Sequence, residues 1–468
     1  MADTTSRRLS GTISDWKPEE PGFWESAGKR IAYRNLWISV YALLLAFCIW
    51  LMFSAITVYL PGIGFPFSKS QLFWLTAIAG LSGATLRIFY SFFVPIFGGR
   101  NWTVISTASL LIPAAGVGLA VQHPGTPYGA FLVLAALCGL GSANFASSMA
   151  NISFFFPKSL KGTALGLNAG LGNLGVSVIQ FAAPFVIALN LFGALGGGSQ
   201  ILVKDGARQA VWVQNMSFFW IPFIIVAIGL AMWGMNNLTT ARASFKDQAV
   251  IFKRKHNWLI CLLYLGTFGS YIGYSASFPL LTNTLFPDVN PLSYAFIGAL
   301  LGAAIRPLGG WLSDKLGGAR VNLVNYLVMI LAVLGALYFI GQRAEPGAFW
   351  GFLALFIVLF LATGIGNGAV FRMIPIIFLA ERLCAVRGQG EEAEAGATRE
   401  AAKESAAVIG FSSAIGAYGA FFIPIGFGQS IAATGEPAPA LLAMIGFYVI
   451  CIVITWWFYA RRNAETPC

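Results

Sequence analysis

The sequence predicts an all-α membrane protein with twelve transmembrane helices, and three observations support this class. Hydrophobic residues make up 57% of the 468-residue chain and charged residues only 10%, with a mean hydropathy of +0.74. A soluble domain carries about 25% charged residues. Four windows hold no Asp, Glu, Lys or Arg: residues 101–157, 162–203, 256–287 and 405–435. Because one span needs about 20 apolar residues, these windows accommodate several helices.

Glycine, proline and polar residues divide the apolar sequence into twelve segments of spanning length. We expect helices at 36–62, 71–97, 101–121, 127–156, 160–190, 212–235, 257–286, 291–313, 319–341, 348–379, 404–432 and 438–460. Residues 1–35 are polar and mixed in charge, so a cytoplasmic tail is expected there rather than a cleaved signal peptide. Residues 461–468 form the second cytoplasmic tail.

The distribution of Lys and Arg predicts the orientation of the chain. Of the 29 basic residues, 22 fall in segments on the same side as the N-terminus and three lie within expected spans. The other side holds only Lys69, Lys204, Arg208 and Arg343. Basic loops stay in the cytoplasm, so both termini are expected there. This bias explains the net charge of +11, so nucleic-acid binding is not needed to account for it. Nucleic-acid binding is usually indicated by a basic patch on a soluble domain.

Two arginines inside predicted helices occupy matched positions. The spacing from Arg87 to the pair Gly98–Gly99 equals the spacing from Arg306 to the pair Gly317–Gly318. A glycine also lies four residues before each arginine, at Gly83 and Gly302. The second and eighth helices are therefore counterparts, and the chain is a duplicated six-helix unit.

A glycine series repeats in the fifth and eleventh helices and supports the duplication. "GLNAGLGNLG" and "GFSSAIGAYG" share a spacing of six and then three residues, with the glycines Gly166, Gly172, Gly175, Gly410, Gly416 and Gly419. Two such halves are expected to be parallel repeats. We therefore predict an N-terminal bundle at 36–235, a cytoplasmic linker at 236–256 and a C-terminal bundle at 257–460.

The depth of the matched arginines indicates a function. Arg87 lies about 15 Å from the nearer end of its helix, and a charge at mid-membrane costs at least about 2.5–3.5 kcal/mol to insert. One reading is a structural arginine bonded to backbone carbonyls. The other is an anion site, because no Asp or Glu is expected within the membrane to neutralise these charges. The planar guanidinium suits flat oxyanions. Arg372 lies two turns before the end predicted at 379, where we expect its side chain to extend to the surface.

Three motifs carry a family resemblance. "RPLGGWLSDKLGGARV" at 306–321 resembles the loop motif of major facilitator transporters, although Pro95 stands in the first half where Asp314 stands in the second. "AGLGNLGVS" and "GFSSAIGAYGAFF" are similar to the two nitrate signatures of the nitrate/nitrite porter family. The similarity spans nearly all of the chain after residue 30. It implies the major facilitator fold, a bacterial inner membrane location, and nitrate and nitrite as substrates.

The resemblance also implies site residues. It assigns Tyr264, Phe145 and Phe268 to anion binding beside Arg87 and Arg306. Asn173, the polar residue inside the first glycine series, is a further candidate ligand, and we expect the six series glycines and Asp314 to act in conformational change. Packing is the alternative for the glycines and the aromatic residues, and a packing hydrogen bond for Asn173.

We therefore expect a transporter that exchanges nitrate and nitrite by alternating access, acting as a monomer in the lipid bilayer, with no cofactor, metal or catalytic residue. Nitrate–proton symport is the alternative, which an intramembrane Asp, Glu or His would favour. A channel, a membrane enzyme and a receptor fit less well. The chain shows no filter-like repeat, no convergent titratable or metal-ligating group, and no appended cytosolic domain.

Overall fold

The computed structural model describes residues 11–204, 207–239 and 249–468. Within these residues, twelve helices are long and apolar enough to cross a membrane, as the sequence predicts. The protein is an all-α, multi-pass membrane protein, with two short two-stranded sheets among the described residues. Residues 1–10 of the expected tail and residues 240–248 of the expected linker lie outside the described ranges.

The chain divides into two compact units. Unit 1 consists of Met1–Ser68 and Ile78–Ala243, and unit 2 of Lys69–Ala77 and Ser244–Cys468. The first turns of α4 (Lys69–Phe97) thus belong to unit 2. There Phe73 packs beside Phe427, with ring centroids 6.2 Å apart.

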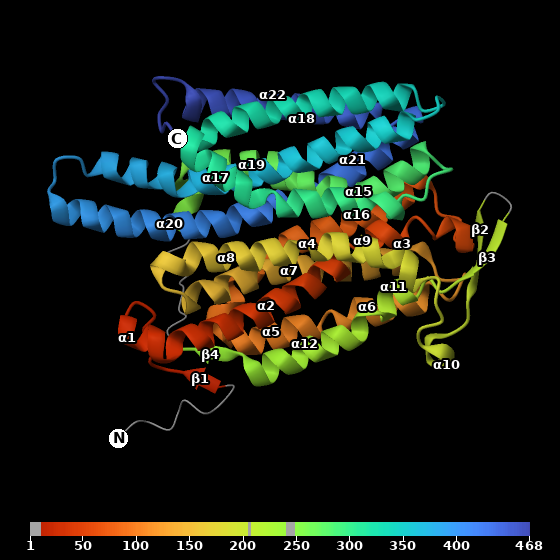
Figure 1. Ribbon diagram of the computed structural model, residues 1–468, viewed down its shortest axis with the longest axis horizontal. Helices are drawn as coiled ribbons and strands as arrows, with labels where there is room; N and C mark the ends of the chain where they lie inside the picture. The colour runs from red at the N-terminus through yellow and green to blue at the C-terminus, as the bar shows by residue number, and fades with distance from the viewer. Residues whose placement is uncertain (1–10, 205–206, 240–248) are drawn as a thin grey trace. The chain divides into compact units, whose positions relative to one another are not determined.

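Unit 1 contains six of the long helical spans. In chain order its helices and strands are β1 (Gly11–Ile13), α1 (Pro21–Phe23), η2 (Trp24–Gly28), α2 (Lys29–Trp50), α3 (Met52–Ile56), η3 (Pro61–Ile63), α4, α5 (Gly99–Ala108), α6 (Leu111–Ala120), α7 (Tyr128–Phe155), α8 (Lys158–Asn173), α9 (Gly175–Val186), α10 (Gly193–Gly196), β2 (Gln200–Lys204), β3 (Ala207–Val211), α11 (Asn215–Phe218), α12 (Trp220–Gly234) and β4 (Asn236–Leu238). Strands β2 and β3 form an antiparallel hairpin, and β1 pairs with β4 in parallel, with Gly11 opposite Asn236 (Figure 1).

Unit 2 contains the other six spans. Its helices are η4 (Ala249–Lys253), α14 (Lys255–Tyr264), η5 (Leu265–Gly269), α15 (Ser270–Leu285), α16 (Leu292–Ala304), α17 (Arg306–Leu316), α18 (Gly318–Gly341), α19 (Ala348–Ala385), α20 (Glu391–Ala417), α21 (Gly419–Thr434), α22 (Ala438–Thr455) and η6 (Trp456–Ala460). The fifth span of each unit has the same interruption. One residue, Leu174 or Tyr418, separates two helices just before the last glycine of the series, although its φ and ψ remain helical.

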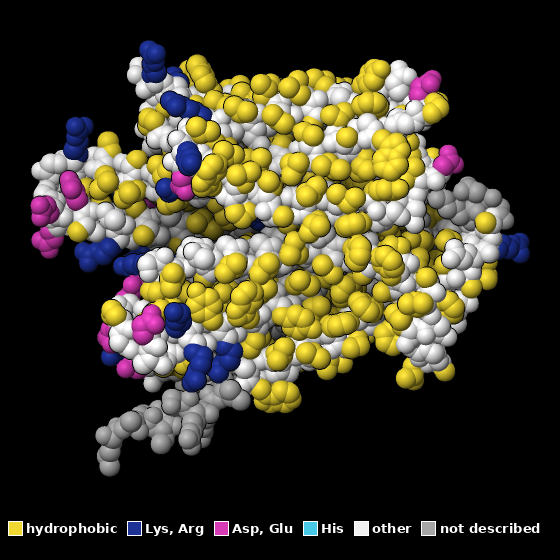
Figure 2. All heavy atoms as spheres, viewed as in Figure 1, with side chains coloured by type: hydrophobic (Ala, Val, Ile, Leu, Met, Phe, Trp, Pro, Cys, Tyr) yellow, Lys and Arg dark blue, Asp and Glu magenta, His cyan; other side chains and the backbone are white. Residues whose placement is uncertain are grey.

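Three helices extend beyond the ends expected from hydropathy. The first begins at Pro21 rather than 36, the tenth ends at Ala385 rather than 379, and the eleventh begins at Glu391 rather than 404. The added residues of the eleventh helix are mainly Ala and Glu, which favour helix in water. In Figure 1 the end of α19 and the start of α20 project together past the neighbouring helices of unit 2. Figure 2 shows charged side chains at this tip.

The third span of each unit begins with the same capped turn. Gly98 and Gly317 adopt φ of 84° and 88°, which residues with a side chain avoid. Two residues later, the N–H of Arg100 donates to Asn237 Oδ1 at 2.9 Å and that of Ala319 to the Cys468 carbonyl oxygen at 3.0 Å. In both units, the segment after the sixth span therefore returns to cap the third.

The sides of the spanning helices carry exposed apolar side chains. Figure 2 shows hydrophobic residues along the helices, while Lys, Arg, Asp and Glu gather near the helix ends. Phe181 and Trp233 of unit 1 and Val324 of unit 2 are 49%, 69% and 64% exposed. Such side chains suit contact with lipid, because lipid tails are as apolar as the side chains themselves.

Candidate functional site

Arg87 lies within the unbroken helix α4 and is only 1% exposed. Its Nε donates to both the carbonyl oxygen and the Oγ of Ser142 on α7, each at 2.9 Å. Three rings surround the guanidinium carbon, with the Phe145, Trp50 and Phe47 centroids at 4.7, 5.1 and 5.8 Å. Cation–π contacts of this kind offset part of the cost of burying the charge.

Arg306 lies at the first residue of α17, where the helical span is interrupted at Ile305. Pro307 follows, and because proline has no N–H it cannot continue the hydrogen-bond ladder. Arg306 is half-buried, and its Nη2 donates to the Tyr264 hydroxyl oxygen at 3.2 Å. Its Nη1 is buried and has no hydrogen-bond partner among the described residues.

A stack of three rings lies beside Arg306. Tyr264 is sandwiched between Phe268 and Phe371, with centroid distances of 5.2 and 4.8 Å and interplanar angles of 13° and 14°. The Phe371 and Phe268 centroids are 5.5 and 6.0 Å from the guanidinium carbon. Tyr264 immediately precedes the π-helical turn η5, an irregularity often found at functional sites.

The surroundings of the two arginines share two features. Phe47 lies over Arg87 and Phe268 over Arg306, so each unit places a ring from its first span over the arginine of its second. Trp50 Nε1 donates to the Ala79 carbonyl at 3.0 Å, and the Tyr271 hydroxyl donates to the Ala299 carbonyl at the same distance. The duplication therefore includes a ring over each arginine and a hydrogen bond from the first span of each unit to a backbone carbonyl of the second.

The series glycines occupy matched environments. A Cβ at Gly172 would meet the Leu43 side chain at 2.6 Å, and one at Gly416 would meet Tyr264 at 2.7 Å. A Cβ at Gly175 or Gly419 would collide with backbone atoms of the first span of the same unit. Close packing within each unit accounts for these four glycines. At Gly166 and Gly410 nothing lies within 4 Å of the Cβ position.

Two further predicted residues have distinct surroundings. Asn173 is the last residue of α8 and is fully buried, yet neither amide atom bonds a described residue. The packing hydrogen bond considered for it is therefore not observed. Asp314 forms an ion pair with Arg372, and both side chains are exposed. The exposed guanidinium of Arg372, which we expected to extend to the surface, thus pairs there with a carboxylate.

One carboxylate is buried at the residue where the eleventh span is expected to begin. Glu404 of α20 is only 6% exposed and accepts from Nη2 of Arg382 at 2.6 Å and from Nη2 of Arg254 at 3.1 Å. Hydropathy placed Glu404 at the edge of a helix, because it did not detect that α20 begins as early as Glu391. Two arginines contact its carboxylate, so Glu404 belongs to an ion-pair cluster that joins α19, α20 and Arg254, the residue just before α14.

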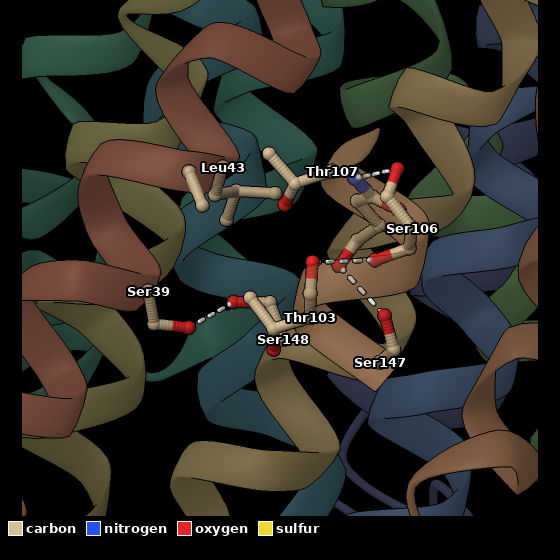
Figure 3. A pocket seen from close by; sticks show the side chains of 9 residues that line it. Ser39, Leu43, Thr103, Ser106, Thr107, Ser147 and Ser148 are labelled. Carbon is tan, nitrogen blue, oxygen red and sulfur yellow. Dashed lines mark hydrogen bonds between the residues drawn. The ribbon is translucent and has the colours of Figure 1, made fainter. Parts of the chain in front are cut away.

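A small polar cavity of about 10 Å³ lies inside unit 1, on another face of α7 from that which contacts Arg87. Figure 3 shows Ser39 and Ser148 pointing toward one another, with a hydrogen bond of 2.8 Å between their Oγ atoms. The lining residues are Ser39, Ala42, Leu43, Thr103, Ser106, Thr107, Asn144, Ser147 and Ser148. With neutral walls and room for about one water molecule, the cavity does not suit an anion.

The sequence argument missed Phe47, Trp50 and Ser142 beside Arg87, and Phe371 beside Arg306. Aromatic residues are 15% of the chain, so their type alone singles out none of them. The repeat could have found one pair, because the offset in numbering between Phe47 and Phe268 is close to the offset between the two arginines.

Comparisons with known proteins agree with this architecture. The profile of the Major Facilitator Superfamily matches residues 42–390. The chain is 51% identical over 464 residues to the nitrate/nitrite transporter NarU of Escherichia coli K12, covering 99% of both chains. It is 40% identical to the probable nitrate/nitrite antiporter NarK2 of Thermus thermophilus, with 97% of this chain and 98% of the relative covered. It is 24% identical to the nitrite extrusion protein of Bacillus subtilis, with 91% of this chain and 94% of the relative covered. The chain belongs to the nitrate/nitrite porter family of the major facilitator superfamily.

Proposed function

We propose that this protein exchanges nitrate and nitrite across the bacterial inner membrane, working as a monomer with both termini in the cytoplasm. The orientation follows from the bias of basic residues. The substrates follow from the family and from the names of two relatives, a nitrate/nitrite transporter and a probable nitrate/nitrite antiporter. The transporter class also separates this protein from the membrane enzymes considered above.

The observation that carries the proposal is the matched pair of arginines among aromatic rings. Each unit contributes one guanidinium in a low-dielectric environment, and a guanidinium stays charged at any working pH. In unit 2 the Tyr264 hydroxyl oxygen accepts from Arg306, and a hydroxyl that accepts a hydrogen bond can also donate one to an anion oxygen. Flat anions such as nitrate suit both the planar donor fork and the parallel rings of Phe268 and Tyr264.

Exchange follows from the charges. With two guanidiniums and one monovalent anion, the loaded carrier retains one positive charge where the empty carrier has two. Closing the protein around bare guanidiniums removes their water at a cost that rises as the dielectric constant falls. A bound anion offsets much of this cost. The loaded carrier should therefore change sides far more readily than the empty one.

Other residues have supporting roles in this proposal. Asn173 offers a buried donor to the anion, in keeping with its lack of a hydrogen bond to any described residue. Gly166 and Gly410, whose Cβ positions are open, are the series glycines best suited to conformational change. The pair of Asp314 and Arg372 joins α17 to α19 at their charged ends and should favour one state of the cycle over the other.

Anion counterflow in proteoliposomes tests the proposal. Vesicles loaded with nitrite should take up nitrate quickly, and vesicles without internal nitrate or nitrite should take up almost none, with or without a pH gradient. Proton symport remains the second candidate. Rapid uptake into substrate-free vesicles under an inward proton gradient would replace exchange by symport.

A further inference from the structure

The fourth span of each unit carries the same short motif. Residues 139–143 read "GLGSA" and residues 364–368 read "GIGNG". The structure supports this alignment, because a Cβ at Gly139 would collide with Gly83 and one at Gly364 with Gly302. Gly83 and Gly302 are themselves the matched glycines before the arginines. Ser142 of α7 is therefore the counterpart of Asn367 of α19.

The two counterparts have different hydrogen-bond partners. Ser142 accepts the Nε–H of Arg87 at 2.9 Å through both its Oγ and its carbonyl oxygen. Asn367 is fully buried, and neither its Nδ2 nor its Oδ1 has a hydrogen-bond partner among the described residues. A buried amide without partners costs about 1–3 kcal/mol, so a function is expected for it.

Asn367 lies on α19 beside the Arg306 site. The Cβ position of the next residue, Gly368, meets the Arg306 carbonyl oxygen, which brings the backbones of α17 and α19 together at this point. One helical turn after Asn367, the Phe371 ring lies 5.5 Å from the Arg306 guanidinium carbon. Residues four apart share a face of a helix. The side chain of Asn367 is thus on the face of α19 that packs beside Arg306.

We infer that Asn367 is an anion-binding residue of unit 2, an inference that rests on the proposed function. A guanidinium only donates hydrogen bonds, and nitrate or nitrite only accepts them. A carboxamide between them can do both. In the structure neither amide atom of Asn367 nor Nη1 of Arg306 has a partner among the described residues. In the anion-bound protein, Oδ1 would accept from Nη1 of Arg306 and Nδ2 would donate to an oxygen of the anion. Anion binding would then satisfy groups that are otherwise buried without partners.

Thermal unfolding of the purified full-length protein, with and without nitrate, tests this inference. Asn367→Leu keeps most of the side-chain volume and removes the amide. The nitrate-free Tm should stay the same or rise, because an unsatisfied buried group is lost. The nitrate dissociation constant should rise by about tenfold or more, as expected when a hydrogen bond to a charged ligand is removed. Asn367→Ser, which copies unit 1, should recover part of the affinity.

Asn322→Leu is the matched control. Asn322 is also fully buried in unit 2, and its Oδ1 also has no hydrogen-bond partner among the described residues, but its Nδ2 bonds the Met373 sulfur at 3.1 Å. Its replacement should leave the nitrate dissociation constant unchanged. Asn367→Asp should weaken binding more than Asn367→Leu does, because a carboxylate competes with the anion for Arg306.

Two results would overturn the inference. If Asn367→Leu bound nitrate as tightly as the wild-type protein, Asn367 would not touch the anion. If it lowered the nitrate-free Tm without changing the dissociation constant, the amide would have a packing role. A wild-type protein that nitrate does not stabilise at all would refute the proposed function itself, and the inference would fall with it.

Discussion

The two copies of the six-helix unit hold their arginines differently. In unit 1, Arg87 is almost fully buried on a continuous helix and bonds a backbone carbonyl and a hydroxyl of Ser142. In unit 2, Arg306 follows the one-residue interruption between α16 and α17, is half-buried, and donates to the hydroxyl of Tyr264. A carbonyl of a packed helix is a fixed partner. A tyrosine hydroxyl can reorient, so unit 2 has the more adjustable arginine.

The differences between the copies concentrate on residues that touch the arginines or join neighbouring helices. Tyr264 of unit 2 corresponds to Leu43 of unit 1. Tyr264 packs against Gly416 and Leu43 against Gly172, and each residue lies four positions before the phenylalanine over the arginine of its unit. The ion pair of Asp314 and Arg372 has no equivalent in unit 1, where Pro95 and Ser147 occupy the aligned positions. Duplication thus preserved the close backbone contacts and the ring of the first span over each arginine, while the polar partners of the arginines diverged.

The largest effect is expected from replacing either arginine by lysine. Arg87→Lys and Arg306→Lys should each lower nitrate exchange on the order of 100-fold, because an ammonium cannot reproduce the planar donor fork. Only Arg87→Lys should also lower the nitrate-free Tm, since it loses the bonds to Ser142. Exchange rates and thermal unfolding of both variants check this. An equal loss of Tm in both would show that the two arginines are anchored alike.

A smaller effect is expected from the tyrosine that only unit 2 has. Tyr264→Phe keeps the stacked ring and removes the hydroxyl, so the nitrate dissociation constant should rise about tenfold. Leu43→Met, a nearly volume-conserving change at the matched position, should leave it unchanged. Nitrate titrations monitored by Tm measure both values. Tight binding by Tyr264→Phe would place the anion away from this ring.

The smallest effect is expected at the matched caps of the third spans. Asn237→Ala should lower the free energy of unfolding by about 1 kcal/mol, because the N–H of Arg100 loses its side-chain acceptor. Deleting residues 465–468 should have a similar effect on unit 2, where Cys468 caps Ala319. Thr398→Ala, an exposed change on α20, should stay within about 0.5 kcal/mol as a control. If Asn237→Ala were as stable as the wild type, the caps would be dispensable.

Hydropathy and spacing predicted the twelve spans and the repeat because both follow from residue type at fixed intervals. They could not locate the start of the first and eleventh helices. Hydropathy reports transfer into lipid, whereas residues such as Glu391 continue a helix in water through backbone propensity. For the same reason, hydropathy predicted Glu404 at the start of the eleventh helix, whereas α20 begins thirteen residues earlier, at Glu391.

The arginines were predictable because a charge inside a charge-free stretch stands out. Phe145, Tyr264 and Phe268 were named only through the family resemblance, and the structure brings each of them to an arginine. Phe371 and Asn367 lie in the fourth span of unit 2, and no residue of that span appeared in the predicted site. Their position depends on the crossing of α17 and α19, which no local pattern encodes.

The hairpin formed by the end of α19 and the start of α20 has a practical consequence for electron microscopy. A 50.1 kDa protein inside a detergent micelle offers little mass for aligning particle images. Residues 386–390 join two helices that continue directly from spanning segments, and Gly388 and Gly390 make the turn with φ of 83° and 97°. A compact soluble protein inserted there through two continuous helices would form a rigid alignment marker outside the micelle.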